Sequence, residues 1–230
     1  MAIAITEVTP EVATSSNTNT YAFAAFTPTA GAYLVVFAFQ SGSVAAGGIS
    51  NTGTTLSWTQ LGTQLYNTTD TAYCYAAKVP ASVSSTTITV NTTGDNSTGS
   101  VICCFQVTGH NVDYPIAQFV KNAGTGTANP AFTRVAADTN NGYMAGFGSS
   151  NNPPTSTQPT SWTEIMDTGY TVPTAGATAA FRAGGETSTT VTFTAASGNW
   201  GGFYLEINEA TVGFPPAPFP NSLMLMGYGI

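Results

Sequence analysis

A short motif occurs twice in this chain of 230 residues, as SWTQL at residues 57–61 and as SWTEI at residues 161–165. Each copy is followed, in the same order, by a Thr-rich alternating segment (TTITV, then TTVTF) and by an apolar segment that contains FQV or LEI. The matching segments are separated by about 100 to 110 residues, and such recurrence indicates an internal duplication. We therefore predict two related halves, at about 15–109 and 123–208.

The duplication also sets expected partners for two aromatic positions. Tyr33 and Phe37 lie in the segment YLVVFAF, and Tyr143 and Phe147 lie in the segment YMAGFG. Both pairs precede a copy of the Trp motif, so we expect Tyr33 to correspond to Tyr143, and Phe37 to Phe147.

Short segments rich in β-branched and aromatic residues alternate with Gly, Asn, Ser and Pro along most of the chain. This pattern is typical of strands joined by turns, and no segment has the period of a long amphipathic helix. The predicted strands of the first half are 20–27, 32–40, 56–66, 72–79, 86–91 and 101–108. Those of the second half are 127–134, 142–148, 161–172, 177–182, 189–194 and 202–208.

These strands predict an all-β protein. YLVVFAF and VICCFQV are nearly continuously apolar, which indicates central strands covered on both faces. One jelly-roll-like β-sandwich over 1–208, built from the two related halves, is the preferred architecture. Two tandem β-sandwiches are the alternative, because about 100 residues suffice for an immunoglobulin-sized unit. Asp95-Asn96 and Asn141-Gly142 are expected in tight turns.

The composition changes at about residue 209, where the segment EATVGFPPAPFPNSLMLMGYGI begins. Its prolines cannot donate to a strand ladder and favour a polyproline-like chain, so 209–230 is predicted to be an extended C-terminal arm. Such an apolar arm should pack against its own domain or a neighbouring subunit. The expected anchors are Phe214, Phe219, Leu223, Leu225 and Tyr228. The N-terminal segment AIAITEV is a second candidate to span a seam between subunits.

Charged residues are scarce: the chain has 4 basic and 11 acidic residues, and its formal net charge is −7. Nucleic-acid binding requires clustered Lys and Arg, so this composition argues against it. No apolar run approaches the ~20 residues of a membrane-spanning helix. The N-terminus lacks a basic region followed by an apolar core and a cleavage site, so we read no signal peptide and expect synthesis in the cytoplasm.

Candidate catalytic and metal-binding residues are few. His110 is the one histidine, Asp113 is close to it in sequence, and no G-x-S-x-G nucleophile motif accompanies them. The cysteines, Cys74, Cys103 and Cys104, lack C-x-x-C spacing and are interpreted as buried free thiols. The segment 138–142 is similar to a calcium loop but lacks the downstream bidentate acid. We predict no catalytic residue, cofactor or metal, and no enzymatic activity; a hydrolase centred on His110 is the least favoured hypothesis.

Two carboxylates, Glu164 and Asp167, lie close together in sequence. Glycoside hydrolysis needs two carboxylates across a cleft. On an extended strand a separation of three residues places the side chains on opposite faces, about 10 Å apart. The spacing therefore argues against this chemistry.

Trp58 and Trp162 occupy matching positions in the two Trp motifs. We interpret them as duplicated core, because an enclosed Trp side chain buries about 200 Å². The alternative is that two exposed indoles stack on the sugar rings of a glycan.

The segments YLVVFAF, LSWTQLG, TAYCYAAKV, STTITVNTT and GSVICCFQVTG together resemble the β-sandwich repeats of tailed-bacteriophage virion proteins and of some bacterial surface proteins. The second series, from NGYMAGFG to GGFYLEIN, is similar in outline, so the resemblance covers nearly the whole of residues 15–208. The C-terminal arm departs from the usual pattern of these proteins. The shared motifs are structural. The resemblance implies a virion-surface or attachment role and brings no catalytic residues with it.

The preferred function is a capsid decoration or cement protein on the exterior of a phage head, made in the host cytoplasm and located on the virion surface. Its expected partners are the major capsid protein or other virion subunits, and a homo-oligomer such as a trimer fits symmetric particle sites. The alternative is a tail or fibre module for receptor binding. In that case the loops 41–55 and 149–160, expected at one end of the molecule, would contact host glycans.

Overall fold

The computed structural model describes residues 2–42, 45–93, 98–135, 138–150, 156–172 and 174–210. Within these residues the chain is all-β, as the sequence predicts, with sixteen strands and no helix. The strands of the first half are β1 (Ala4–Glu7), β2 (Val12–Thr14), β3 (Thr20–Ala22), β4 (Tyr33–Ser41), β5 (Ala45–Thr52), β6 (Ser57–Leu65), β7 (Thr71–Lys78), β8 (Thr87–Thr93) and β9 (Gly99–Thr108). Those of the second half are β10 (Ile116–Thr127), β11 (Ala131–Thr133), β12 (Gly142–Ser149), β13 (Thr163–Thr171), β14 (Thr174–Arg182), β15 (Thr190–Thr192) and β16 (Gly198–Ile207).

Each half of the chain supplies one large and one small antiparallel sheet. The large sheet of the first half has the order β1-β9-β4-β7-β6, with β2 also paired to β9, and that of the second half has the order β10-β16-β12-β14-β13. In both sheets the strand that begins the half therefore pairs with the strand that ends it. The small sheets are β3-β8-β5 and β11-β15.

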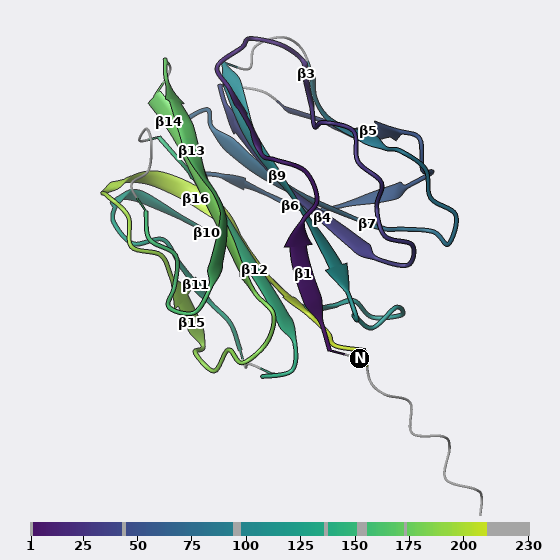
Figure 1. The fold of residues 1–230 in the computed structure, drawn as a ribbon. Helices are drawn as coiled ribbons and strands as arrows, with labels where there is room; N and C mark the ends of the chain where they lie inside the picture. Colours follow the sequence, from purple (N-terminus) through teal and green to yellow (C-terminus); the bar gives the residue numbers. More distant parts are fainter. Residues whose placement is uncertain are drawn as a thin grey trace, which may run out of the picture.

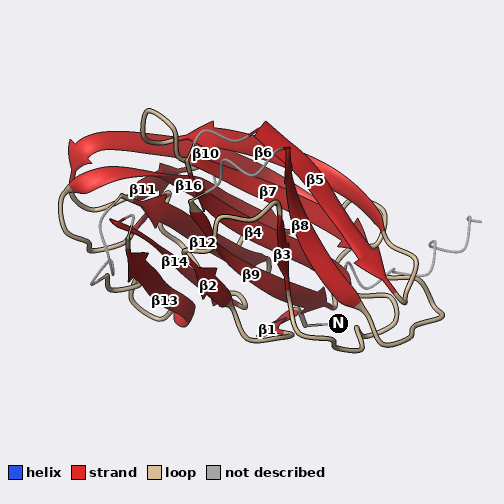
Figure 2. Cartoon of the chain, turned by 90° about the horizontal axis from the view of Figure 1, so that it is seen from above, coloured by secondary structure: helices blue, strands red, loops and turns tan. Residues whose placement is uncertain are grey.

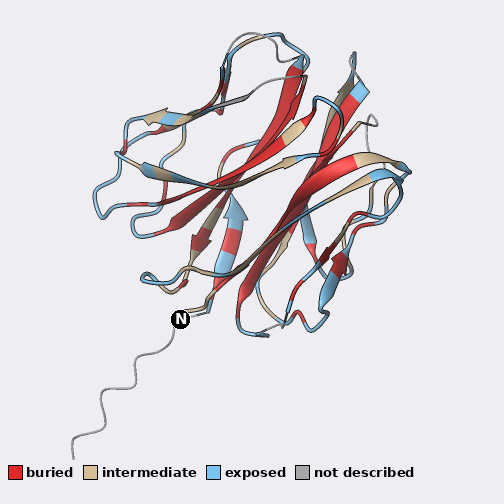
Figure 3. Ribbon diagram, turned by 180° about the vertical axis from the view of Figure 1, so that it is seen from behind, coloured by how far each residue is buried: buried red, intermediate tan, exposed pale blue. Residues whose placement is uncertain are grey.

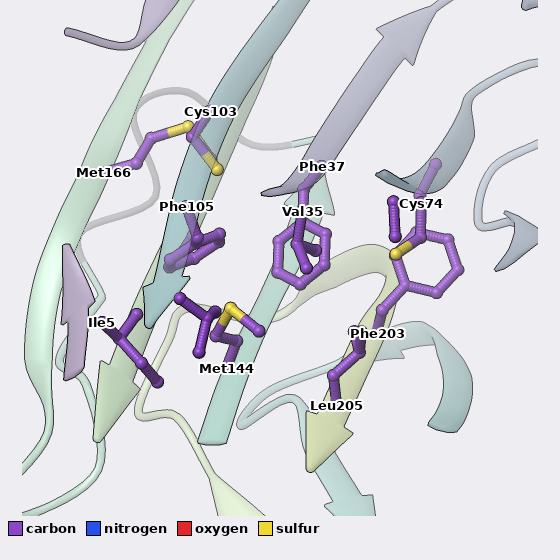
Figure 4. Packing of buried hydrophobic residues seen from close by; sticks show 14 of the residues in the cluster. Ile5, Val35, Phe37, Cys74, Cys103, Phe105, Met144, Met166, Phe203 and Leu205 are labelled. Carbon is purple, nitrogen blue, oxygen red and sulfur yellow. The ribbon is translucent and has the colours of Figure 1, made fainter. Parts of the chain in front are cut away.

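The four sheets form four layers, with the two large sheets in the middle (Figure 1). A central core lies between the large sheets and contains Phe37, Phe105, Met144 and Phe203 (Figure 4). Separate outer cores lie between each large sheet and the small sheet of its own half. The all-β, β-sandwich class predicted from the sequence is confirmed, with one outer core in each half and a central core between the two large sheets.

The apolar strands lie where their sequence predicts. All nine residues of β4 are buried, and alternate side chains serve different cores: Val35, Phe37 and Phe39 point into the central core, whereas Leu34 and Val36 point into the outer core. The buried strands run through the middle of the molecule, and exposed residues concentrate on edge strands and loops (Figure 3). A strand without polar alternation is thus explained by burial on both faces.

The predicted correspondence of the aromatic landmarks is wrong by one residue. Tyr33 pairs with Val107 of β9, and Gly142 pairs with Ile207 of β16, so Tyr33 corresponds to Gly142 and Phe37 to Gly146. Tyr33 and Phe37 accordingly face the central core, whereas Tyr143 and Phe147 face the outer core of the second half. A shift of one residue reverses the face of every side chain on a strand.

This difference makes the inner faces of the two large sheets complementary. A Cβ added at Gly146 would lie 3.0 Å from Cδ2 of Phe37, and one added at Gly148 would lie 2.9 Å from Cδ1 of Phe39. Large side chains of the first half thus enter spaces left by glycines of the second half. Hydrogen bonds also join the halves, including one of 2.8 Å between Ser41 Oγ and Tyr170 Oη.

Several strands were missed or misplaced by the sequence analysis. β5 lies inside the expected loop 41–55, and β10 precedes the predicted strand 127–134, because both are rich in Gly, Asn and Thr and lack a clear apolar alternation. The N-terminal segment, a candidate to span a seam between subunits, forms β1 within its own chain. β1 pairs with β9, and Ile5 together with the preceding Ile3 is buried in the central core.

Candidate interaction surface

The molecule has two distinct ends. Because Phe37 and Phe39 lie against Gly146 and Gly148 in that order, β4 and β12 run in the same direction. The ends of both strands, and hence the loops that follow them, therefore lie at one end of the molecule, here called the loop end. The opposite end contains residues 109–116 and 207–210, with the N-terminal strand beside them, and is called the tail end (Figures 1 and 2).

Backbone hydrogen bonds fix the last described residues to the loop that connects the two halves. Asn208 N donates to Pro115 O at 2.9 Å, and Asn111 N donates to Asn208 O at 2.8 Å. Ala210 N donates to Gly109 O at 2.8 Å. The chain that continues into the predicted arm therefore leaves from a fixed point at the tail end.

Apolar side chains are exposed around this point. Tyr114 is 75% exposed and Val112 is 61% exposed, both on the connecting loop. Val135 is 93% exposed, and its backbone N–H donates to Gln118 Oε1 near the start of β10, at the same end. Single exposed apolar residues are ordinary, but three on neighbouring segments favour an interaction surface.

A buried ion pair lies in the second half of the chain, close to the tail end. Arg134 Nη1 lies 3.4 Å from Glu206 Oε2, and both side chains are almost completely buried. Glu206 Oε2 also accepts from Gln118 Nε2, and its Oε1 accepts from the backbone N of Asp138 and from Asn141 Nδ2. Buried charges need such partners, because desolvation of each ion is costly. The network fixes the segment that carries Val135.

The first half uses an uncharged version of this arrangement. Gln106 of β9 corresponds to Glu206 of β16, and its Oε1 accepts from the backbone N of Thr29 at 2.7 Å. Its Nε2 donates to Thr29 Oγ1 at 3.0 Å. In both halves a polar side chain near the end of the last strand thus holds the loop that precedes the first central strand.

His110 lies at the tail end but is enclosed. It is 4% exposed, its ring centroid is 5.6 Å from that of Tyr33, and its Nδ1 has no hydrogen-bond partner. Burial lowers its pKa, as does the positive charge of Lys78, against a backbone hydrogen bond at Val107 that raises it. Among the described residues, no hydrogen bond or ion pair joins His110 to Asp113, whose backbone N–H donates to Asn111 Oδ1.

Titratable groups do not gather into a metal-binding arrangement in the part of the chain that the structure describes: no group of three or more His, Cys, Asp or Glu residues has a suitable geometry. The three cysteines are free and buried, as predicted. Burial raises the pKa of all three thiols. The segment 138–142 forms a turn, with Asn141 N donating to Asp138 O at 3.0 Å.

Glu164 and Asp167 do not lie on opposite faces, so that expectation is wrong. A β-bulge at Ile165 shifts the alternation of β13, and the two acids pair with Ala180 and Thr178, which share a face of β14. Burial raises the pKa of both carboxyls. Asp167 Oδ1 accepts a hydrogen bond from Thr178 Oγ1 at 3.1 Å, and this bond lowers its pKa in part.

The two Trp side chains of the repeated motif do not form a pair of exposed indoles. Trp162 is 5% exposed in the outer core of the second half, and its Nε1 donates to Glu186 Oε2 at 2.8 Å. Trp58 is half-buried against the outer core of the first half, and its Nε1 donates to Asn51 Oδ1. The buried faces of Trp162 cannot stack on a sugar ring, and both indoles belong to corresponding cores.

The edges of the sheets are irregular. β-bulges or irregularities interrupt the edge strands β6, β10 and β13 of the large sheets and β5 of a small sheet. On the remaining edge of the large sheets, β1 and β2 are separated by Pro10. Bulges and prolines hinder pairing between the sheets of different molecules. Pairing of the edges of the large sheets is therefore a poor route to assembly for this chain.

The predicted anchors of the arm (Phe214, Phe219, Leu223, Leu225 and Tyr228) and the predicted turn at Asp95-Asn96 lie outside the described residues. Within the described ranges there is no helix with the length and apolar character needed to span a membrane. Comparisons of the chain with models of known protein families, with curated proteins and with solved structures gave no match.

Proposed function

We propose that this chain is a non-enzymatic structural protein of a bacteriophage virion, and that it decorates or cements the exterior of the head. The observation that carries the proposal is the tail end. There, Val112 and Tyr114 are exposed on the connecting loop that is bonded to Asn208 and Ala210, where the described chain leads into the apolar C-terminal segment. Val135 is exposed at the same end. The partners would be the major capsid protein or other virion subunits, with copies of this chain arranged as a homo-oligomer at symmetric sites.

The rest of the surface supports attachment by this end alone. The bulged edges oppose strand pairing, and the scarcity of charged residues gives little electrostatic steering toward a partner. Burial of apolar side chains is the remaining source of binding free energy, at roughly 25 cal/mol per Å² removed from water. The shared strand order of the halves supports their interpretation as related repeats that form one scaffold.

A truncation that ends at Ala210 tests the proposal. It keeps all the described strands, so it should fold, but it should no longer join particles that lack the protein. Tyr114→Ser should weaken attachment of the full chain, whereas Leu65→Ser should not, since Leu65 is 56% exposed at the loop end. Attachment of the truncated protein with undiminished affinity would show that the arm is not the anchor.

A tail or fibre module for receptor binding is the second candidate. The observation in its favour is that β4 and β12 both end at the loop end, opposite the point where Ala210 is bonded to Gly109, so this end would face outward from an attached particle. Binding of the isolated full chain to a glycan array would support this function. Glycan contacts would then come from the loop end, since Trp162 is buried.

A further inference from the structure

A hollow of about 470 Å³ opens beside the tail end, on the inner face of the first large sheet. Tyr33, Lys78 and Ser57 are paired across β4, β7 and β6 and form one row of its lining. Ala76 and Thr59 form the next row, and Pro80 and Pro115 belong to the same lining. We call this hollow the tail-end groove.

The groove has a largely apolar character, and Lys78 is the charged residue of its lining. The ammonium group of Lys78 donates to the backbone carbonyl of Val112 in the connecting loop. The lining therefore presents a tyrosine ring, two prolines and an alanine, with exposed Ser57 and Thr59 on β6. Grooves of aromatic and apolar side chains with a few hydroxyl donors bind polyproline II segments, whose carbonyls have no partners within their own chain.

The chain contains one segment of matching chemistry, FPPAPFP at residues 214–220. It has four prolines, two phenylalanines and no charged side chain. Its connection to the described chain is at Ala210, which is bonded to Gly109, and the other end of the connecting loop supplies Pro115 to the groove. The described chain therefore ends, and leads into this segment, at the end of the molecule where the groove lies.

The direction of the chain favours binding between two copies. Asn208 is bonded to Pro115 at the groove, but two residues later Ala210 is bonded to Gly109. Gly109 itself lies close to Ala2, since a Cβ placed there would be 2.3 Å from Ala2 O. The chain thus runs away from the groove when it departs, and a segment that entered the groove of its own chain would have to reverse.

We infer that the tail-end groove binds residues 214–220 of a second copy of this chain. The inference rests on the proposed function, and it identifies the neighbouring subunit that receives the first part of the arm. Each copy offers one groove and one arm, so the contact is heterologous and closes into a ring when the rotation between copies permits.

The test uses two full-length variants that block opposite sides of the contact. Thr59→Trp fills the groove from an exposed position, and a double substitution, Phe214→Ser with Phe219→Ser, removes the apolar groups of the arm. Gln60→Trp is the matched control, because Gln60 is exposed on the same strand but pairs with Tyr75 on the opposite face. Light scattering during size exclusion gives the mass of each protein, and thermal unfolding verifies that each is folded; Ser57→Trp replaces Thr59→Trp if the latter does not fold.

The unmodified chain and Gln60→Trp should form oligomers, with masses at least twice the 23.6 kDa of one chain. Each blocked variant should be a monomer, and an equal mixture of the two should form a dimer, because one intact groove and one intact arm remain. A monomeric unmodified chain, or oligomers that persist in the Thr59→Trp variant, would overturn the inference. Loss of particle binding on truncation at Ala210, together with a monomeric full chain, would leave the proposed function in place and remove only this contact.

Discussion

At the scale of single residues, enclosure of His110 links the stability of the fold to pH. Burial of its ring against Tyr33, together with the positive charge of Lys78, makes protonation in the folded state unfavourable, so its pKa is lowered from 6.5. Well above pH 6.5 the imidazole is neutral in both the folded and the unfolded state. Below that value the unfolded chain takes up a proton first, so the free energy of unfolding falls until the pH reaches the lowered pKa of the folded state.

His110→Phe should make stability less dependent on pH. The variant keeps an aromatic ring against Tyr33 but cannot take up a proton, so its free energy of unfolding should fall less than that of the unmodified chain between about pH 7 and pH 5. Denaturant unfolding at several pH values measures this difference. Because the chain has one histidine, the NMR titration of its imidazole can be assigned without further variants. Equal pH dependence in the two proteins would contradict the assignment of the lowered pKa to His110.

At the scale of elements, glycines let the two large sheets approach each other. A Cβ at Gly201 of β16 would lie 2.4 Å from Cβ of Tyr66, an atom fixed to the backbone. A Cβ at Gly142 of β12 would instead meet Cδ1 atoms of Ile3 and Ile5 at 2.9 Å, and these are the ends of flexible side chains. The same added methyl group thus meets a rigid neighbour at one position and a movable one at the other.

Gly201→Ala should therefore reduce the free energy of unfolding by about 1 to 3 kcal/mol, the usual cost of overpacking a core. Gly142→Ala is the matched control and should cost less, because the ends of Ile3 and Ile5 can rotate. Chemical denaturation of the two variants provides the comparison. An equal cost at both positions would mean that the distance between the sheets, and not the rigidity of the facing atom, sets the effect.

The strands that were predicted correctly have a signal within their own sequence, such as the apolar run of β4 or the alternation of β8. The missed strands have none: in the edge strands β5 and β10 the few large apolar residues do not alternate regularly with polar ones, and pairing with β8 and β16 defines these strands. The bulge at Ile165 and the one-residue offset between Phe37 and Phe147 also arise from pairing. Local patterns therefore predicted the class of the fold, but not the register that decides which side chains face each other.

The candidate site was predictable only in part for a related reason. The apolar arm is visible in the sequence, because prolines and large apolar residues follow one another. The exposure of Val112 and Tyr114 depends on how the connecting loop crosses the tail end, and that of Val135 on the segment that follows β11. No periodicity encodes either path. The arrangement of Tyr33, Thr59 and Pro115 around one groove joins residues from distant parts of the chain.

At the scale of the whole molecule, the shared central core should make the two sandwiches unfold together. Phe37 and Phe105 of the first half pack with Phe203 and Leu205 of the second, so loss of one half exposes the inner face of the other. In a Trp58→Phe variant the remaining Trp residues report only on the second half, whereas far-ultraviolet circular dichroism reports on both. The two signals should give the same denaturant midpoint, and separate midpoints would indicate independent halves.

The central claim is that this doubled scaffold acts by attachment to a virion through its tail end. Quantitative mass spectrometry of purified particles tests it most directly, because the number of copies follows the symmetry of the sites that the protein occupies. A decoration protein should be present at a number of copies comparable to that of the repeating units of the shell, and a few copies per particle would instead indicate the tail or a fibre. Absence of the protein from purified particles would contradict the account.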